Sequence, residues 1–584
     1  MTPAPAFDLR RSLRMFEPKL LTVLREGYDL RTLRADAVAG LTVAVVALPL
    51  AMALAIASGT TPEKGLHTAI VAGFLISALG GSRVQIGGPT AAFIPVVFVV
   101  IQTFGYGGLI LCTLLAGLML IAAGLLRLGT LMKYMPQPVV TGFTAGIAVS
   151  IFSSQVKDAL GLRMDQVPAE FLPRWKAFAT HIGTTQPAAL GLTAMGLAVI
   201  LGLRRWKPKW PGFLFALLAC TLACLALSLP AETIGSRFGD LPSALPTFDF
   251  PRIPFERTFE LLPSAFTIAF LAGVESLLSA VVADGMTGGR HRSNGELVAQ
   301  GAANVGSALF GGLPATGAIA RTATNVRSGG RTPVAGMLHA AFLLVFMLVL
   351  APVMRYVPLA ALAAVLLVVA WNMAEVENFR NTLSAPIGDR LVLLLTFGLT
   401  VFLDLTVAIQ AGVVVAAFVF MHRMAEAVEV TSGARSAFDE RSGDDPRSAD
   451  AARDTDLDQR DRLPPGVEAY QIGGPLFFGA ASRLDNLLDQ FFEPPKVLIL
   501  RMRLVPVIDA SGVHALKKLA ERCHRKGIVL VVSGLQPQPN RVIARMGLEE
   551  HPGELHFASD FDRALALAKA IVDVPSPAAA TRPA

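Results

Sequence analysis

The residues with the clearest chemical potential are polar groups inside apolar runs between positions 261 and 333. Glu275, Ser279 and Asp284 follow one another along an apolar segment that includes Phe266. A carboxylate in a membrane-spanning helix is energetically costly, so by default it faces a cavity on a substrate or ion path. Glu275 is therefore a candidate site residue, and Ser279 lies one helical turn after it on the same face.

The same stretch contains an interrupted segment. Residues 311–321 read GGLPATGAIAR and lead into a short run of small and apolar residues. A run of about ten such residues is too short to span a bilayer, which needs about 20 residues of helix. We therefore expect a half-helix that begins inside the protein, where its unpaired N–H groups can hold an anion. The stretch predicts an anion site.

A related pattern occurs earlier in the chain. Residues 87–93 read GGPTAAF, and residues 313–318 read LPATGA, so each places Pro and Thr at the start of a short apolar helix. Proline suits the first helical turn, and threonine can cap the helix or contact a ligand. Gly-Pro breaks also occur as simple kinks in membrane helices. The matched pair, with a carboxylate upstream, favours the inverted-repeat arrangement of transporters.

Composition sets the class of protein. The chain has 584 residues, of which 53% are hydrophobic and 16% charged, and its mean hydropathy is +0.55. These values indicate a polytopic α-helical membrane protein that contacts the lipid bilayer. The net charge of +7 does not indicate a nucleic-acid partner, because the excess Lys and Arg lie in loops between apolar segments.

Several kinds of chemistry are not indicated. The four cysteines are scattered, and Cys220 and Cys224 have no nearby His or Cys to complete a zinc set. We therefore predict no metal, no disulfide and no cofactor. No Gly-rich phosphate-binding loop with Lys-Ser/Thr occurs, so ATP-driven transport is not indicated, and we do not expect an enzyme.

Hydropathy predicts fourteen membrane segments within a transport domain at 34–423. Basic loops follow the even-numbered segments, which predicts that both termini are cytoplasmic in a bacterial cytoplasmic (inner) membrane. The basic residues 1–33 form a cytoplasmic segment, and the two repeats occupy 34–230 and 256–423. The predicted segments are 35–56, 66–80, 89–101, 107–126, 137–157, 186–203, 211–229, 262–283, 296–311, 316–327, 334–353, 358–371, 389–405 and 406–421.

The C-terminal part has a different character. Residues 424–466 are charged and small, which predicts a flexible linker, and residues 574–584 are expected to be a disordered tail. Between them, residues 467–573 alternate apolar strands with amphipathic helices, which is typical of a soluble α/β domain. The predicted strands begin at 470, 496 and 527, and the predicted helices are 480–492, 511–525, 537–546 and 559–572.

One turn in this domain is a candidate regulatory site. Asp509 and Ser511 stand where a predicted strand ends and a helix begins. Ser511 is a possible site of phosphorylation, whereas a helix cap is the simpler interpretation, and we favour the cap.

Four motifs carry a resemblance to a known family. They are residues 36–53 (DAVAGLTVAVVALPLAMA), 87–93, 282–288 (VADGMTG) and 323–329 (ATNVRSG), and they are accompanied by the C-terminal α/β domain. With these motifs the chain resembles the SulP (sulfate permease) family of anion transporters, and its C-terminal domain resembles that family's STAS domain. Residues 274–288, 291–301 and 369–375 further resemble the family's bacterial C4-dicarboxylic acid transporters.

The resemblance implies a 7+7 inverted repeat with two half-helices. Segments one to four and eight to eleven would form a substrate-carrying core, and the others a gate. It implies a secondary active transporter of elevator type, a homodimer, and cytoplasmic STAS domains that can dock a protein partner. The anion would lie between the half-helices and beside segment eight, with Phe93 either lining the site or facing lipid. The implied substrate-binding residues are Thr90, Ala91, Phe93, Glu275, Ser279, Thr316, Gly317 and Ala318.

Departures from the family pattern bear on substrate and coupling. Leu50 follows Pro49 where many members have Gln, so a polar contact typical of sulfate binding is missing. Sodium-coupled bicarbonate members have Asp and Thr where this chain has Glu275 and Ile319, and the Ile319 side chain offers sodium no oxygen ligand. A buried carboxylate can instead exchange a proton in the physiological range. A junction residue, Asp404, is a second candidate carboxylate or a helix cap.

We therefore expect proton-coupled uptake of small oxyanions such as C4-dicarboxylates or sulfate, with Glu275 carrying the proton. A sodium-coupled bicarbonate transporter, and an anion channel or exchanger, remain the alternatives. Backbone N–H groups bind any small oxyanion, so the sequence does not separate these substrates.

Overall fold

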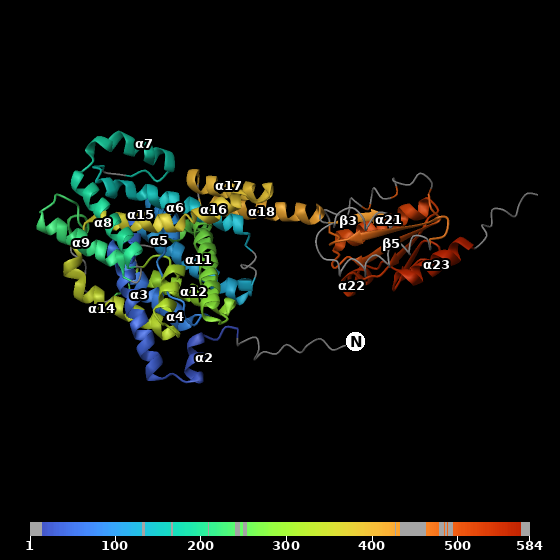
Figure 1. Cartoon of the computed structure of the whole chain (residues 1–584), viewed down its shortest axis with the longest axis horizontal. Helices are drawn as coiled ribbons and strands as arrows, with labels where there is room; N and C mark the ends of the chain where they lie inside the picture. The colour runs from blue at the N-terminus through green and yellow to red at the C-terminus, as the bar shows by residue number, and fades with distance from the viewer. Residues whose placement is uncertain are drawn as a thin grey trace, which may run out of the picture. The chain divides into compact units, whose positions relative to one another are not determined.

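The structure is a computed structural model. It describes residues 15–130, 135–164, 167–207, 210–239, 246–248, 254–403, 405–426, 428–432, 463–477, 484, 488 and 494–573. The chain divides into two compact units, Met1–Ala416 and Ala417–Ala584, and each is considered by itself (Figure 1). Asp404, most of the predicted linker and of the predicted helix 480–492, and the predicted tail lie outside the described residues.

The first unit is helical, and each of the fourteen predicted segments overlaps a helix. Among the described residues, eight helices are long and apolar enough to cross a membrane, and α9 is a shorter apolar helix. The helices are α2 (Lys19–Glu26), α3 (Leu30–Ala57), α4 (Pro62–Leu79), η1 (Ala91–Phe93), α5 (Ile94–Leu125), η2 (Leu128–Thr130), α6 (Gln137–Leu160), α7 (Phe171–His181), η4 (Ile182–Thr184), α8 (Pro187–Trp206), α9 (Gly212–Ala226), α10 (Ile234–Phe238), η5 (Phe255–Arg257), α11 (Thr258–Thr287), α12 (Ser293–Leu309), α13 (Ile319–Arg327), α14 (Pro333–Met354), α15 (Leu359–Met373), α16 (Val376–Leu383), α17 (Ile387–Phe402) and α18 (Leu405–Glu426), which continues into the second unit. The prediction of a polytopic helical membrane protein is confirmed.

Two short helical pieces replace full membrane spans. Helix α13 has 9 residues, which corresponds to about 14 Å at 1.5 Å per residue. The other piece is η1 together with the start of α5, which ends at a kink at Gly105. Gly105 has φ 70°, a left-handed conformation that favours glycine, so the third and fourth predicted segments meet there without a loop.

The helices pack in two groups. In one group α12 packs against α5 and α4, α14 packs against α3 and α4, and α11 packs against α5 and α13. In the other group α17 and α15 pack against α6, while α8 packs against α9 and α15. The first group contains segments one to four and eight to eleven, which is the division into core and gate that the resemblance implied.

The two half-helices start from a short crossing at the centre of the first group. Strand β1 (Gly87–Gly88) pairs with β2 (Thr316–Gly317), with Gly87 opposite Gly317 and Gly88 opposite Thr316. The pairing is antiparallel, so η1 and α13 leave the crossing in opposite directions. This geometry agrees with the inverted repeat that the sequence predicted.

The second unit is an α/β domain built on a five-stranded sheet. Its order is β3 (Glu429–Ser432), β4 (Val467–Gly473), β5 (Val497–Leu504), β6 (Val529–Ser533) and β7 (Leu555–Ala558), with β3 antiparallel and the others parallel. Its helices are α21 (Ala510–Arg525), α22 (Pro537–Arg545) and α23 (Phe561–Asp573), which confirm three of the predicted helices.

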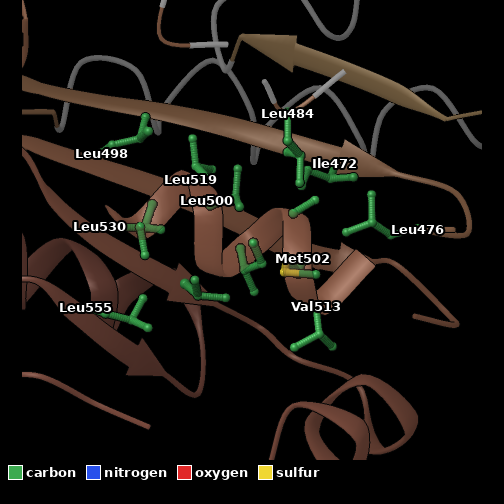
Figure 2. Close-up of a cluster of buried hydrophobic side chains, with 14 of the residues drawn as sticks. Ile472, Leu476, Leu484, Leu498, Leu500, Met502, Val513, Leu519, Leu530 and Leu555 are labelled. Atoms are coloured by element: carbon green, nitrogen blue, oxygen red, sulfur yellow. The ribbon is translucent and has the colours of Figure 1, made fainter. Parts of the chain in front are cut away.

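Alternating side chains of the central strands form two cores. Leu498, Leu500 and Met502 of β5 join the larger core, which includes Leu519 of α21 (Figure 2). Val497 and Ile499 of the same strand face the other way and pack with α23. The period of two along a buried parallel strand explains why β5 reads as a continuous apolar run.

The boundary of this domain requires a correction. The sequence predicted a flexible linker at 424–466, but α18 extends to Glu426 and β3 occupies Glu429–Ser432. Strand β3 forms antiparallel ladder bonds with β4 and so completes one edge of the sheet. A four-residue edge strand in a charged segment has too weak an apolar pattern to be recognised from the sequence. Its hydrogen bonds to β4 hold it in the sheet, and they do not depend on that pattern.

Candidate anion-binding site

The predicted carboxylate lies at the first half-helix. Glu275 is half-buried on α11, and its Oε2 accepts a hydrogen bond of 3.1 Å from the Thr90 hydroxyl. Thr90 has extended backbone and directly precedes η1. The N–H groups at the beginning of a helix have no partner within it, so Glu275 stands beside a set of backbone donors.

A basic residue lies on the other side of the same turn. Arg321 of α13 is buried, with 4% of its surface exposed, and its Nη2 donates to the Pro89 carbonyl oxygen at 3.0 Å. Within the described part of the chain, its Nε and Nη1 have no hydrogen-bond partner. Glu275 and Arg321 therefore contact two consecutive residues of one half-helix from different helices.

Arg321 also explains the absence of a side chain at Gly88. A Cβ at Gly88, which has φ 150°, would lie 2.3 Å from Nη1 of Arg321. The glycine thus allows the guanidinium to reach the crossing. The sequence analysis did not identify Arg321 as a site residue, although a charged residue in a short membrane segment was the available signal.

Side chains replace the backbone hydrogen bonds that the broken helices lack. Asn304 of α12 donates to the Ala315 carbonyl at 2.8 Å and accepts from the Ala315 N–H at 2.9 Å. Asn325 of α13 donates to the Val84 carbonyl at 2.8 Å, next to the first half-helix. Irregular backbone at membrane depth requires such internal partners, so these amides stabilise the two approaches to the site.

A buried hydrogen-bond chain lies beneath the crossing. Gln85 donates to the Ser276 carbonyl and hydroxyl, each at 3.1 Å, and the Ser276 hydroxyl donates to Glu296 at 3.1 Å. Glu296 is fully buried and also accepts from the N–H groups of Gly81 and Ser82. This chain fixes Ser276, the neighbour of Glu275, to the segment that precedes β1.

The sequence did not predict this chain of hydrogen bonds. Gln85, Ser276 and Glu296 come from three separate segments, and only the folded structure brings them together. Glu296, the one charged residue of α12, was the available signal, because an intramembrane carboxylate marks a functional or structural polar contact.

The other predicted residues on the second half-helix are engaged by protein groups. The Thr316 hydroxyl donates to the Ala272 carbonyl at 2.7 Å, and the Ala318 N–H donates to the Ile86 carbonyl at 2.9 Å. Gly317 lies in β2, buried against Gln85. Thr316 and Gly317 form one strand of the crossing and Ala318 directly follows it, so these contacts fix the geometry of the crossing.

Ser279 and Phe93 are both buried. The Ser279 hydroxyl donates to Thr322 of α13 at 3.1 Å, so it joins α11 to the second half-helix and does not point toward Thr90. Phe93 is 2% exposed, which is incompatible with a lipid-facing position. Ala91, the remaining predicted residue, is the first residue of η1 and directly follows Thr90.

The arrangement can hold an anion and exchange a proton. Two helix starts supply backbone donors, Arg321 supplies positive charge, and Glu275 supplies a carboxyl group, which can gain or lose a proton. Paired half-helices that start near the middle of the membrane are typical of inverted-repeat secondary transporters.

Comparison with protein families agrees with this architecture. The model of the sulfate permease family matches residues 33–396, and the STAS domain model matches residues 461–564. The chain belongs to the sulfate permease family and carries a C-terminal STAS domain.

Two relatives illustrate the similarity. YvdB of Bacillus subtilis, provisionally named a sulfate transporter, is 41% identical over 540 residues, which cover 92% of this chain and 98% of YvdB. The bicarbonate transporter BicA of Synechocystis is 29% identical over 543 residues, covering 92% of this chain and 94% of BicA.

Solved structures show the same fold. Murine Slc26a9, an anion transporter in its inward-facing state, superposes with a TM-score of 0.83 at 18% identity and covers 98% of this chain and 96% of its own. The transmembrane domain of a cyanobacterial BicA has a TM-score of 0.59 at 30% identity, covering 67% of this chain and 98% of that domain.

In the STAS domain, Asp509 acts as a helix cap. Its Oδ1 accepts a hydrogen bond of 2.8 Å from the Gly512 N–H at the start of α21. Ser511 is half-buried in the first turn of the same helix. The helix cap, which the sequence favoured over a phosphorylation site, is present.

These roles predict different effects of two substitutions. Asp509→Ala is expected to lower the free energy of unfolding of fragment 417–584 by about 1 kcal/mol, because the cap is lost. Ser511→Ala is expected to change it by less than about 0.5 kcal/mol and to leave transport by the full chain unchanged. Urea unfolding and uptake assays provide the measurements. Inactivation by Ser511→Ala with rescue by Ser511→Asp would instead identify a phosphorylation switch.

Proposed function

We propose that this protein is a secondary active transporter that couples the uptake of a small oxyanion to protons. One observation supports the proposal most directly. Glu275 bonds to Thr90 and Arg321 bonds to Pro89, so a carboxylate and a guanidinium both contact the turn where a half-helix begins. C4-dicarboxylates and sulfate are the proposed substrates. The STAS domain is proposed to act as a docking and dimer-regulating surface of a homodimer in the bacterial inner membrane, with cytoplasmic termini.

The proposed roles follow from the chemistry of each group. The anion binds at the facing starts of η1 and α13, where helix N-termini and the Arg321 guanidinium favour negative charge. The ionised Glu275 carboxylate repels the anion, whereas the protonated carboxyl group is neutral and does not. Proton binding and anion binding therefore favour one another. The core then moves relative to the gate in an elevator-type alternating-access mechanism and carries the anion and the proton across the membrane.

Sodium-coupled bicarbonate transport is the second candidate. It is favoured by the similarity to bicarbonate transporters of cyanobacteria, two of which are 28% and 29% identical to this chain. Ile319 argues against it, because sodium needs several oxygen ligands and this side chain at the start of α13 has none.

One experiment separates these functions. Purified protein in liposomes is supplied with labelled sulfate, bicarbonate or succinate, with an inward proton gradient, an inward sodium gradient or neither. We expect saturable accumulation of sulfate or succinate driven by the proton gradient alone. Accumulation that requires sodium would identify the second candidate, and flux that neither saturates nor follows a gradient would identify a channel.

Thr90→Val tests the contact between the half-helix and the carboxylate. Valine keeps the shape of threonine but removes the hydroxyl that donates to Glu275. A hydrogen bond to a charged group contributes about 1.5–3 kcal/mol, so we expect kcat/KM to fall roughly 10- to 100-fold. Thr90→Ser retains the hydroxyl and should keep most of the activity in the same uptake assay. Equal activity of the two variants would contradict this role of Thr90.

A further inference from the structure

A short amphipathic helix precedes the first membrane helix and is fastened to the core. The Lys19 N–H of α2 donates to the Gly80 carbonyl at 2.9 Å, at the end of α4. Arg292, which precedes α12, donates to the Glu17 carbonyl at 2.7 Å and to the Thr22 hydroxyl at 3.1 Å. These bonds place α2 beside the ends of two core helices.

Leucines of α2 and of the first turn of α3 are exposed. Val23 of α2 is buried against the protein, whereas Leu21 and Leu24 are 42% and 54% exposed. The pattern continues into the first turn of α3, where Leu30 and Leu33 are 79% and 36% exposed. In each pair the residues are three apart and so lie on one helix face. These four residues form the leucine row.

The length of α3 indicates the depth of the leucine row in the membrane. The uncharged part of α3 runs from Ala37 to Ala57, which corresponds to about 31 Å of helix. This length matches the roughly 30 Å hydrocarbon core of a bilayer. Residues 30–36 and the attached α2 therefore lie at the level of the lipid headgroups, where an apolar row has an interface to enter.

The charges at this level are mostly positive. Arg31 and Arg34 are exposed beside the leucine row. Arg25 is paired with Glu17, and Arg83 is paired with Glu26. Asp29 is exposed and caps α3, and Asp36 is fully buried and accepts hydrogen bonds from the Arg331 and Thr332 N–H groups. Arg292 is a second cation beside Glu17, at 3.6 Å, and Lys19 is a further cation. Positive charges therefore outnumber negative ones here, and a surface of anionic lipid complements this region.

We propose that the leucine row inserts into the headgroup region of an anionic bilayer, so that α2 anchors the ends of α4 and α12 to the lipid surface. The leucines provide apolar contact with the acyl-chain boundary, and Arg31 and Arg34 provide attraction to acidic headgroups. The partner is thus a lipid surface, at a site separate from the transport site.

Depth measurements with a spin label test the proposal in the full-length protein. Leu24→Cys and, as a second position, Leu21→Cys are labelled in bilayers of phosphatidylcholine and phosphatidylglycerol. The four native cysteines are buried, and burial raises the pKa of the Cys523 thiol to about 12, so little of it is reactive thiolate at neutral pH. We expect both labels to collide more often with oxygen than with a water-soluble nickel complex.

Two matched positions calibrate the result. Leu118→Cys, on an exposed face of α5 and seven residues from its end, should report the membrane interior, and Ala510→Cys, exposed on the C-terminal unit, should report water. Labels at 21 and 24 that behave like the label at 510 would overturn the proposal. Protection from both reagents would also overturn it, because it would show that protein covers the leucine row.

The lipid charge is tested with the same labels. In bilayers of phosphatidylcholine alone, or after Arg31→Gln with Arg34→Gln, the label at 24 is expected to move measurably toward water. An unchanged depth in both cases would exclude anionic lipid as the preferred partner.

Discussion

Replacing Glu275 by Gln is expected to abolish accumulation driven by a proton gradient, so that the internal anion concentration rises no higher than the external one. Glutamine has nearly the same shape and can still bond to the Thr90 hydroxyl, but it cannot take up or release a proton. Exchange of labelled for unlabelled anion across the membrane requires no net proton movement, and we expect it to persist. Both quantities are measured in liposomes with the gradient imposed by buffer.

Glu260→Gln provides the matched control. Glu260 lies in the first turn of the same helix, its side chain is 56% exposed, and it pairs with Arg257. The same chemical change there should leave accumulation unaltered. If Glu275→Gln retained full acid-stimulated accumulation, another group would have to carry the proton.

Gly317→Ala is expected to disrupt the crossing from which the half-helices start. A Cβ at Gly317 would lie 1.4 Å from Nε2 and 2.5 Å from Cδ of Gln85. Gln85 would have to move and lose both bonds to Ser276. Overpacking costs about 1–3 kcal/mol, and each buried polar group left without a partner costs about 1–3 kcal/mol more. We therefore expect a fall of several degrees in the unfolding temperature and loss of anion-dependent stabilisation.

Gly191→Ala and Gly398→Ala serve as controls for the loss of a glycine. These residues lie on α8 and α17, and a Cβ at either position meets nothing within 4 Å. Alanine is a better helix former than glycine, so these variants should be as stable as the parent or slightly more stable. If Gly317→Ala had the same unfolding temperature and the same anion-dependent stabilisation as these two control variants, the close contact with Gln85 would be irrelevant to the site.

The sequence alone predicted the features that arise from local physical rules. Glu275 was found because a carboxylate is costly in an apolar helix. The half-helices were found because Pro and Gly interrupt apolar runs too short to span a membrane. Both rules depend only on one residue or segment and the lipid around it. They can therefore be applied without knowing which segments pack together.

The features that the sequence did not predict depend on pairing between distant segments. Gln85, Ser276 and Glu296 form one hydrogen-bond chain, although 191 residues separate Gln85 from Ser276. Ser279 was expected at the site because it lies one turn from Glu275, but its hydroxyl is directed to Thr322. Helical spacing gives the face of a residue and leaves the choice between neighbouring partners to tertiary packing.

The crossing of β1 with β2 has a consequence for biosynthesis. The Pro89 carbonyl receives its bond from Arg321, which is encoded 232 residues later. At about 5–20 residues per second, the ribosome needs roughly 10–50 s to pass from one to the other. During that interval the first half-helix is already made, but the carbonyl groups of Ile86 and Pro89 lack their final partners, Ala318 and Arg321. The nascent chain must therefore keep this turn hydrated, or covered by the insertion machinery, until the second half of the protein arrives.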